Sequence, residues 1–135
     1  MISFESKFFQ KFNFTAKQLK QYFVSAERDF AIAVEDIIPE VRFKFAYDAV
    51  IKTGIFLIAQ AGYKVHSQTG HHVRILEKLS EILDYDDVTI MGNIMRQKRN
   101  RDLYDGGTII TETEAMQYVE FAGNIIKKAK NKLKN

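Results

Sequence analysis

The amino-acid sequence predicts an all-α fold, an antiparallel up-and-down bundle of four or five helices. The 135 residues include one proline and seven glycines, so long helices can run without interruption. Apolar residues recur at three- and four-residue steps, and no segment sustains the strict alternation of a strand. Because 135 residues can form one core but not two, residues 1–135 are expected to be a single domain.

The first two helices have recognisable ends. Residues 1–14 form an N-terminal lead-in, and the first helix is expected from Thr15, a suitable N-cap, to about residue 36. Pro39 suits the first turn of a second helix, where its missing N–H costs nothing, and Gly62 is a natural stop. Gly54, within this second helix, indicates either the close approach of a neighbouring helix or a position where glycine is merely tolerated.

Three more helices complete the predicted bundle, at about 69–83, at about 87–103 and from Thr111 onward. Thr111 and Glu114 have the spacing of a capping box, in which each side chain binds the other's backbone N–H. The last helix ends in a lysine-rich segment, residues 127–135, whose five lysines account for the net charge of +3, because the remainder carries −2. Lysines stabilise a helix C-terminus through the helix dipole, so a solvated helix end is favoured there over a nucleic-acid contact.

The composition excludes several classes of function. Without cysteine the chain has no disulfide framework and no thiolate chemistry. The longest apolar stretch, residues 54–59, is too short to span a bilayer, and no secretory signal is visible, so a cytoplasmic protein with no membrane partner is expected. His66, His71 and His72 lack the spacing of a metal site, which favours a polar cap or core-edge role. Neither a metal nor a cofactor is expected.

The fourth helix carries charged residues that packing alone does not explain. With ~100° between successive residues, its core face consists of four apolar residues, Val88, Met91, Ile94 and Met95. Arg96 and Asn100 then lie roughly opposite this face, and Arg99 lies at its edge. Lys98 and Asp102 lie close to the apolar stripe, at the four-residue spacing of an ion pair.

The end of this helix is the candidate binding site. Charged side chains near an apolar stripe are costly unless they are paired or the helix end projects beyond its own core. We therefore expect this end to contact another subunit, a ligand or a nucleic acid, with a frayed end in water as the alternative. An Arg side chain can hold a phosphate through two hydrogen bonds, and a Tyr hydroxyl can donate one more. The candidate residues are Arg96, Arg99, Asn100, Arg101, Tyr104 and Asp105.

The order and spacing of these segments resemble the HEPN domain family, small all-helical bundles of prokaryotic toxin–antitoxin and defence systems. The resemblance covers most of the chain. It consists of a long helical hairpin, a third helix that opens with Thr-Gly-His-His-Val-Arg-Ile-Leu-Glu-Lys-Leu (69–79), a fourth helix that ends in Arg-Asn-x-x-x-Tyr-Asp (99–105), and an alanine-rich last helix. The chain is more similar to a subgroup that reads Arg-x-x-x-x-Tyr-Asp at this place.

The resemblance implies catalytic roles for Arg99, Asn100 and Tyr104. Catalytic members of the family cleave RNA without a metal, using an Arg, a following polar residue and, after three further residues, a His, all paired across a two-fold dimer. Here Tyr104 stands in the place of that His. A phenol with a pKa of about 10 cannot act as a base near neutrality, as an imidazole with a pKa of about 6.5 does. Whether the chain is an enzyme therefore stays open.

Two functions follow as hypotheses, beside a purely structural bundle. The first is a HEPN-like homodimer that binds RNA or a nucleotide at the end of the fourth helix, including as the ribonuclease toxin of a toxin–antitoxin pair. The resemblance then implies a small nucleotidyltransferase as antitoxin. The second is a catalytically inactive interaction module that docks such a partner protein. The homodimer is expected because Arg99 and Tyr104 lie ~140° apart on one helix, whereas two copies can form a composite groove.

Overall fold

The computed structural model of the protein describes residues 2–104 and 109–134, including the side chains in these ranges except those of residues 102–104. Over these ranges the chain forms five helices and a two-stranded sheet. In chain order the elements are β1 (Phe9–Lys11), α1 (Ala16–Glu35), α2 (Pro39–Gln60), β2 (Tyr63–Val65), α3 (His71–Leu83), α4 (Asp87–Tyr104) and α5 (Glu112–Leu133). The all-α class is thus confirmed, with a small sheet added to it.

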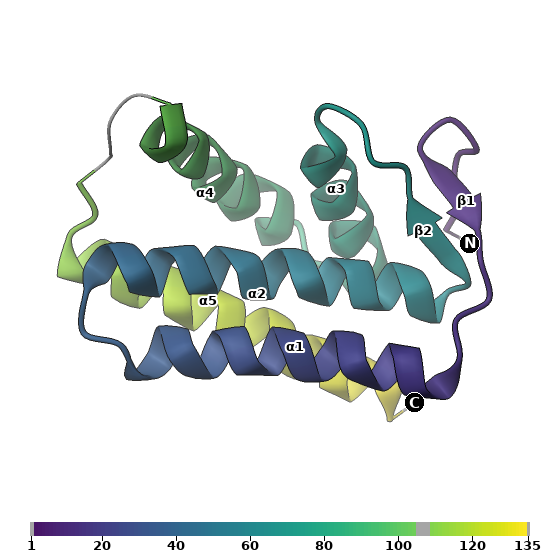
Figure 1. Cartoon of the computed structure of the whole chain (residues 1–135), viewed down its shortest axis with the longest axis horizontal. Helices are drawn as coiled ribbons and strands as arrows, with labels where there is room; N and C mark the ends of the chain where they lie inside the picture. The colour runs from purple at the N-terminus through teal and green to yellow at the C-terminus, as the bar shows by residue number, and fades with distance from the viewer. Residues whose placement is uncertain (1, 105–108, 135) are drawn as a thin grey trace.

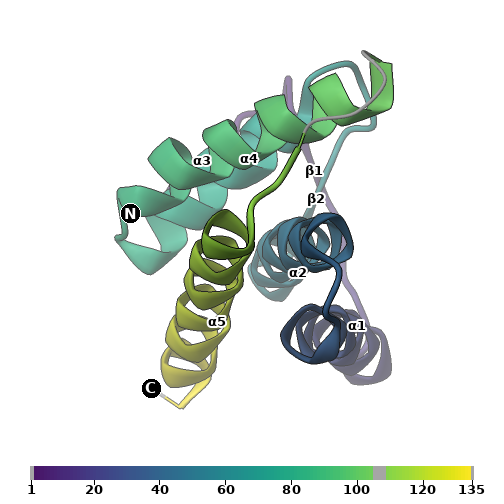
Figure 2. The same cartoon turned by 90° about the vertical axis from the view of Figure 1, so that its left-hand side faces the viewer.

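Helix α2 lies at the centre of the molecule. Figure 1 shows α1 and α2 as a long antiparallel pair, and α3 and α4 as a second pair of helices that lies along the other side of α2. Figure 2, turned by 90°, shows α5 packed beside α2 and beneath the α3–α4 pair. The up-and-down arrangement that we predicted is therefore only partly right, because α5 runs in the same general direction as α2 in Figure 1.

The predicted helix ends are confirmed where local chemistry defines them. The Thr15 hydroxyl accepts a hydrogen bond from the Gln18 backbone N–H at 3.1 Å, and the Gln18 side chain accepts one from the Thr15 N–H at 2.9 Å. Pro39 occupies the first turn of α2. Thr111 and Glu114 form the second capping box, with the Glu114 N–H donating to the Thr111 hydroxyl at 3.0 Å. These bonds satisfy backbone groups that a helix start leaves without partners.

The small sheet is the feature that the sequence did not predict. Strand β1, which lies within the lead-in of residues 1–14, pairs antiparallel with β2, so that Phe9 is opposite Val65 and Lys11 is opposite Tyr63. Phe4 stacks on the Tyr63 ring with 4.2 Å between the ring centroids, and Phe9 is buried. Strands of three residues are too short to show an alternating pattern, which is why periodicity gave no signal for them.

Two glycines allow the helices to approach closely. A Cβ atom at Gly54 of α2 would lie 2.5 Å from Cγ2 of Ile75 on α3. A Cβ atom at Gly92 of α4 would lie 2.7 Å from Cδ2 of Leu76, also on α3. Ile75 and Leu76 are both fully buried, so neither side chain can move into water to make room. The close approach inferred from Gly54 is confirmed, and α3 is held against α2 and α4 through two glycine contacts.

We predict that Gly54→Ala destabilises the fold by up to about 2 kcal/mol, because an overpacking cost of about 1–3 kcal/mol outweighs the gain in helix propensity of about 1 kcal/mol. Chemical denaturation followed by circular dichroism measures the difference. Gly123→Ala on α5 is the matched control, because its Cβ would meet the Phe30 ring at 3.0 Å, and this ring, unlike Ile75, is partly exposed. A Gly54→Ala protein as stable as the parent would contradict the tight contact between α2 and α3.

Candidate functional site

The buried side of α4 differs from the one that the sequence predicted. As a result, Arg96 and Arg99 are partly buried against the neighbouring helices. Val88, Gly92 and Met95 are buried, whereas Ile94 is 41% exposed. Arg99 continues the stripe of Val88, Gly92 and Met95, and it is half-buried. The assignment of Ile94 to the core was therefore wrong. A helical wheel treats every turn of a helix alike, but which side of α4 is covered depends on how the helix crosses α2 and α3.

Arg99 faces a tyrosine of α2, and the charges of Arg96 and Arg99 act on that tyrosine and on a histidine of α3. The guanidinium carbon of Arg99 lies 5.7 Å from the centre of the Tyr47 ring, within reach of a cation–π interaction. Arg96, placed opposite the core by the sequence analysis, is half-buried, and its charge acts on both Tyr47 and His72. The three helices α2, α3 and α4 therefore bring two cations, a phenol and an imidazole together.

Tyr47 and His72 form a hydrogen-bonded pair in this cluster. The Tyr47 hydroxyl oxygen lies 2.8 Å from Nδ1 of His72, at the first turn of α3. Burial raises the pKa of Tyr47 to about 12, and the charges of Arg99 and Arg96 oppose this rise. Burial also lowers the pKa of His72 to about 4, assisted by His71, Arg99 and Arg96. At neutral pH the pair is therefore a protonated phenol and a neutral imidazole, in which the Tyr47 hydroxyl donates to Nδ1 or, in the other tautomer of His72, the Nδ1–H donates to the hydroxyl oxygen.

Asp48 is the acidic side chain nearest in effect to Arg99. Burial raises the pKa of its carboxyl group, and Arg99 is the strongest of the charges that oppose this shift. In the part of the chain that the structure describes, no carboxylate lies within ion-pair distance of Arg96 or Arg99. The described polar contact of Arg96 is local, with its Nε donating to Asn93 at 3.2 Å. Both guanidinium groups thus keep hydrogen-bond donors for a ligand.

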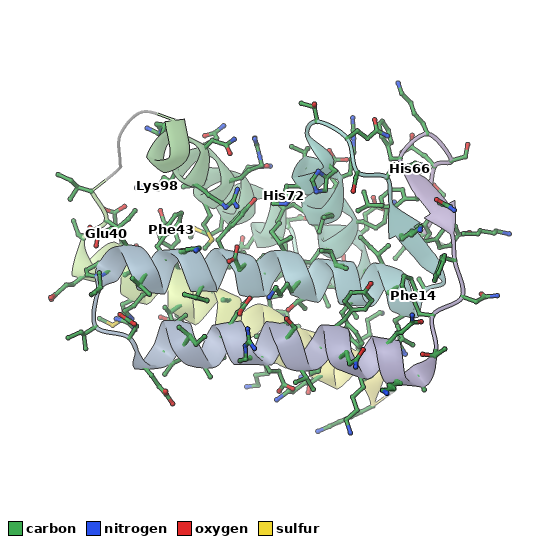
Figure 3. All side chains as sticks on the ribbon, viewed as in Figure 1. Phe14, Glu40, Phe43, His66, His72 and Lys98 are labelled. Carbon is green, nitrogen blue, oxygen red and sulfur yellow. The ribbon has the colours of Figure 1, made fainter. Side chains whose placement is uncertain are left out.

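Lys98 has a different role from its neighbours. The Asp102 side chain, which has the spacing for an ion pair with Lys98, lies outside the described residues; Lys98 forms a close ion pair with Glu114 at the start of α5. This hydrogen bond raises the pKa of Lys98 and lowers the pKa of Glu114. Figure 3 shows Lys98 on the side of α4 away from His72. Lys98 therefore fixes the C-terminal half of α4 to α5 and is not a member of the arginine cluster.

The other predicted site residues are placed as follows. Asn100 and Arg101 are exposed on the last turns of α4. Tyr104 is the final residue of that helix, its side chain lies outside the described residues, and Asp105 lies outside them altogether. The phenol that lies beside Arg99 among the described side chains is Tyr47. The three- and four-residue periodicity of the second helix marks Tyr47 only as a core residue, and the sequence predicts a polar-cap or core-edge role for His72. Neither prediction joins the two residues, because no local pattern links positions on different helices.

Other kinds of site can be judged for the described ranges. No group of three or more His, Asp or Glu side chains in residues 2–104 and 109–134 is arranged to hold a metal ion. No helix within these ranges is both long enough and apolar enough to cross a membrane.

Comparisons with models of protein families, with curated proteins and with solved structures yield no match to the chain. Its function has to be inferred from its own residues.

We predict that NMR titration of the imidazole protons will give a pKa of about 4 for His72. The fold then loses stability as the pH falls from about 6.5 to about 4, because the unfolded chain binds a proton that folded His72 excludes. In Arg99→Ala the pKa of His72 should rise, since one of the positive charges that lower it is gone. A value near 6.5 in the parent protein would show that the imidazole is exposed to water and not buried beside Tyr47.

Proposed function

We propose that the chain is a HEPN-like protein that binds RNA or a nucleotide through a phosphate held by Arg96 and Arg99. The observation that carries this proposal is a pair of half-buried arginines without an ion-pair partner among the described side chains, with Arg99 over the Tyr47 ring and both charges acting on Tyr47 and His72. Two positive charges beside a neutral imidazole favour an anion over a cation at this place. The order of the helices and the Arg-Asn-x-x-x-Tyr-Asp segment at 99–105 support the family assignment.

The chemistry of the cluster suits a phosphate group. Each guanidinium can donate two parallel hydrogen bonds to phosphate oxygens, and these charge-assisted bonds are stronger than neutral ones. Partial burial strengthens them further, because water competes less for the same atoms. A negative ligand beside His72 would also offset the positive charges that now help to keep its imidazole neutral. His72 then becomes a candidate proton carrier for RNA cleavage in the proposed toxin, a role for which the phenol of Tyr104 is unsuited near neutral pH.

A second candidate function is the interaction module, and exposed apolar residues favour it. Ile37, in the turn between α1 and α2, is 87% exposed, and Ile109, before α5, is 85% exposed. Figure 1 shows that this turn and the start of α5 lie at the same end of the molecule. Exposed isoleucines at one end suit the docking of another protein, such as a nucleotidyltransferase antitoxin or a second copy of the chain.

The test is RNA binding and cleavage by the purified protein in the presence of a chelator. We expect Arg99→Ala to weaken the affinity for single-stranded RNA by at least about tenfold, the loss of a charge-assisted contact of about 1.5–3 kcal/mol. Arg96→Ala should act in the same direction. The affinity should fall steeply with salt concentration. Each arginine variant should reduce the slope of log affinity against log salt concentration by about one, the value for one phosphate contact. Fluorescence anisotropy with a labelled oligonucleotide measures all of these values.

The control is Arg28→Gln, which removes an exposed positive charge from α1 on the far side of α2. This variant should leave RNA affinity unchanged if the arginine cluster, and not overall charge, binds the ligand. Cleavage that is lost in His72→Gln but retained in Tyr104→Phe would identify the imidazole as the proton carrier. Equal affinities for the parent, Arg96→Ala and Arg99→Ala would refute the proposed site and favour the interaction module.

A further inference from the structure

A cavity lies on the side of α3 opposite α4, next to the small sheet. Its volume is about 200 Å³, and it is lined by Phe8 just before β1, the end of β2, the connection over residues 66–70 and the first turns of α3. The side chains that give it chemical character are Phe8, His66, Gln68, His71 and Arg74. Most pockets for drug-sized ligands have volumes of at least about 300 Å³. This cavity suits a smaller group, about the size of a single nucleotide base.

Arg74 and Phe8 form a stacked pair at this cavity. The guanidinium carbon of Arg74 lies 3.8 Å from the centre of the Phe8 ring, the closest cation–ring approach among the described residues. The described acidic partner of Arg74 is Glu77, which lies at 3.4 Å and is half exposed to water. Arg74 therefore keeps most of its five N–H donors for another group. Planar guanidinium groups and aromatic rings are the surfaces on which unpaired RNA bases stack.

His71 connects this cavity with the arginine cluster. Its side chain lines the cavity, and its ring centre lies 4.7 Å from that of His72. Its Nδ1 lies 2.9 Å from the carbonyl oxygen of Gln68, which accepts a hydrogen bond only if Nδ1 carries the proton. Figure 3 shows His66 beside the sheet and His72 on the side of α3 that faces α4. The two sites are thus neighbours around the first turn of α3.

We propose that this cavity holds one base of a single-stranded RNA, while the 5′-phosphate of the preceding nucleotide lies on Arg96 and Arg99. The strand would pass around the first turn of α3, with the two histidine rings between the base and the phosphate. This inference rests on the proposed function and adds a subsite to it. It makes the preferred ligand a strand of at least two nucleotides, in place of a free mononucleotide or an isolated phosphate.

The experiment compares three ligands of increasing size by isothermal titration calorimetry with a chelator present. These are uridine 5′-monophosphate, uridine 5′-diphosphate, which adds a phosphate but no base, and the 5′-phosphorylated dinucleotide pUpU. Stacking of one base strengthens binding by roughly five- to hundredfold. We expect pUpU to bind at least about tenfold more tightly than the diphosphate. Arg74→Gln should abolish this gain and leave the affinity for the monophosphate within about twofold.

Two further variants separate this subsite from the proposed function. Phe8→Leu removes the ring but keeps an apolar side chain, and it should weaken pUpU binding in the same way as Arg74→Gln. Arg99→Ala should weaken the binding of all three ligands. Equal affinities for the diphosphate and pUpU, or full pUpU affinity in Arg74→Gln, would overturn the base subsite while leaving the arginine site intact. Failure of all three ligands to bind the parent protein would overturn the proposed function itself.

Discussion

The burial of α2 on all of its sides is the constraint on which the rest of the structure depends. Helices α1, α3, α4 and α5 and strand β2 all pack against α2. A helix surrounded in this way needs apolar side chains around its whole circumference, and most residues between Phe43 and Ala59 are indeed buried. Tyr47 is on the side of α2 covered by α3 and α4, so its ring is buried while its hydroxyl reaches His72. The same packing that forms the core therefore also places the polar atoms of the candidate site.

Polar residues along α2 extend from the candidate site toward α1. Lys52 follows Asp48 by four residues, and its Nζ forms an ion pair with the buried Asp29 of α1 at 2.7 Å. It also donates to the hydroxyl of Ser25 at 2.9 Å. An ion pair of this kind adds little net stability, because removing the charges from water costs about as much as their attraction returns. Separating the partners would leave the Asp29 carboxylate buried alone, so the pair fixes how α1 and α2 align along their length.

The sequence was informative where the determining chemistry is local. Thr15, Pro39 and Thr111 define helix starts through atoms within three residues of each other, and Gly54 indicated a close helix contact from a single position. The strands could not be predicted, because residues 9–11 pair with residues 63–65 and neither segment has a pattern of its own. Tyr47 and His72 were missed for the same reason: their hydrogen bond joins two helices. The partly buried position of Arg96 depends on how α4 crosses its neighbouring helices. A helical wheel carries no information about this crossing.

Glu114 takes part in two contacts at once, a capping box and an ion pair between helices. Its side chain accepts a hydrogen bond from the Thr111 backbone in the capping box of α5, and it also forms the ion pair with Lys98 of α4. Protonation of the Glu114 carboxylate would weaken both the capping box at the start of α5 and the ion pair that holds α4 against α5. Because the pKa of Glu114 is lowered in the folded protein, both contacts persist as the pH falls through the ordinary carboxyl range and weaken together only at lower pH. The position of Arg96 and Arg99 on α4 is therefore coupled to the protonation of Glu114, which belongs to a different helix, α5.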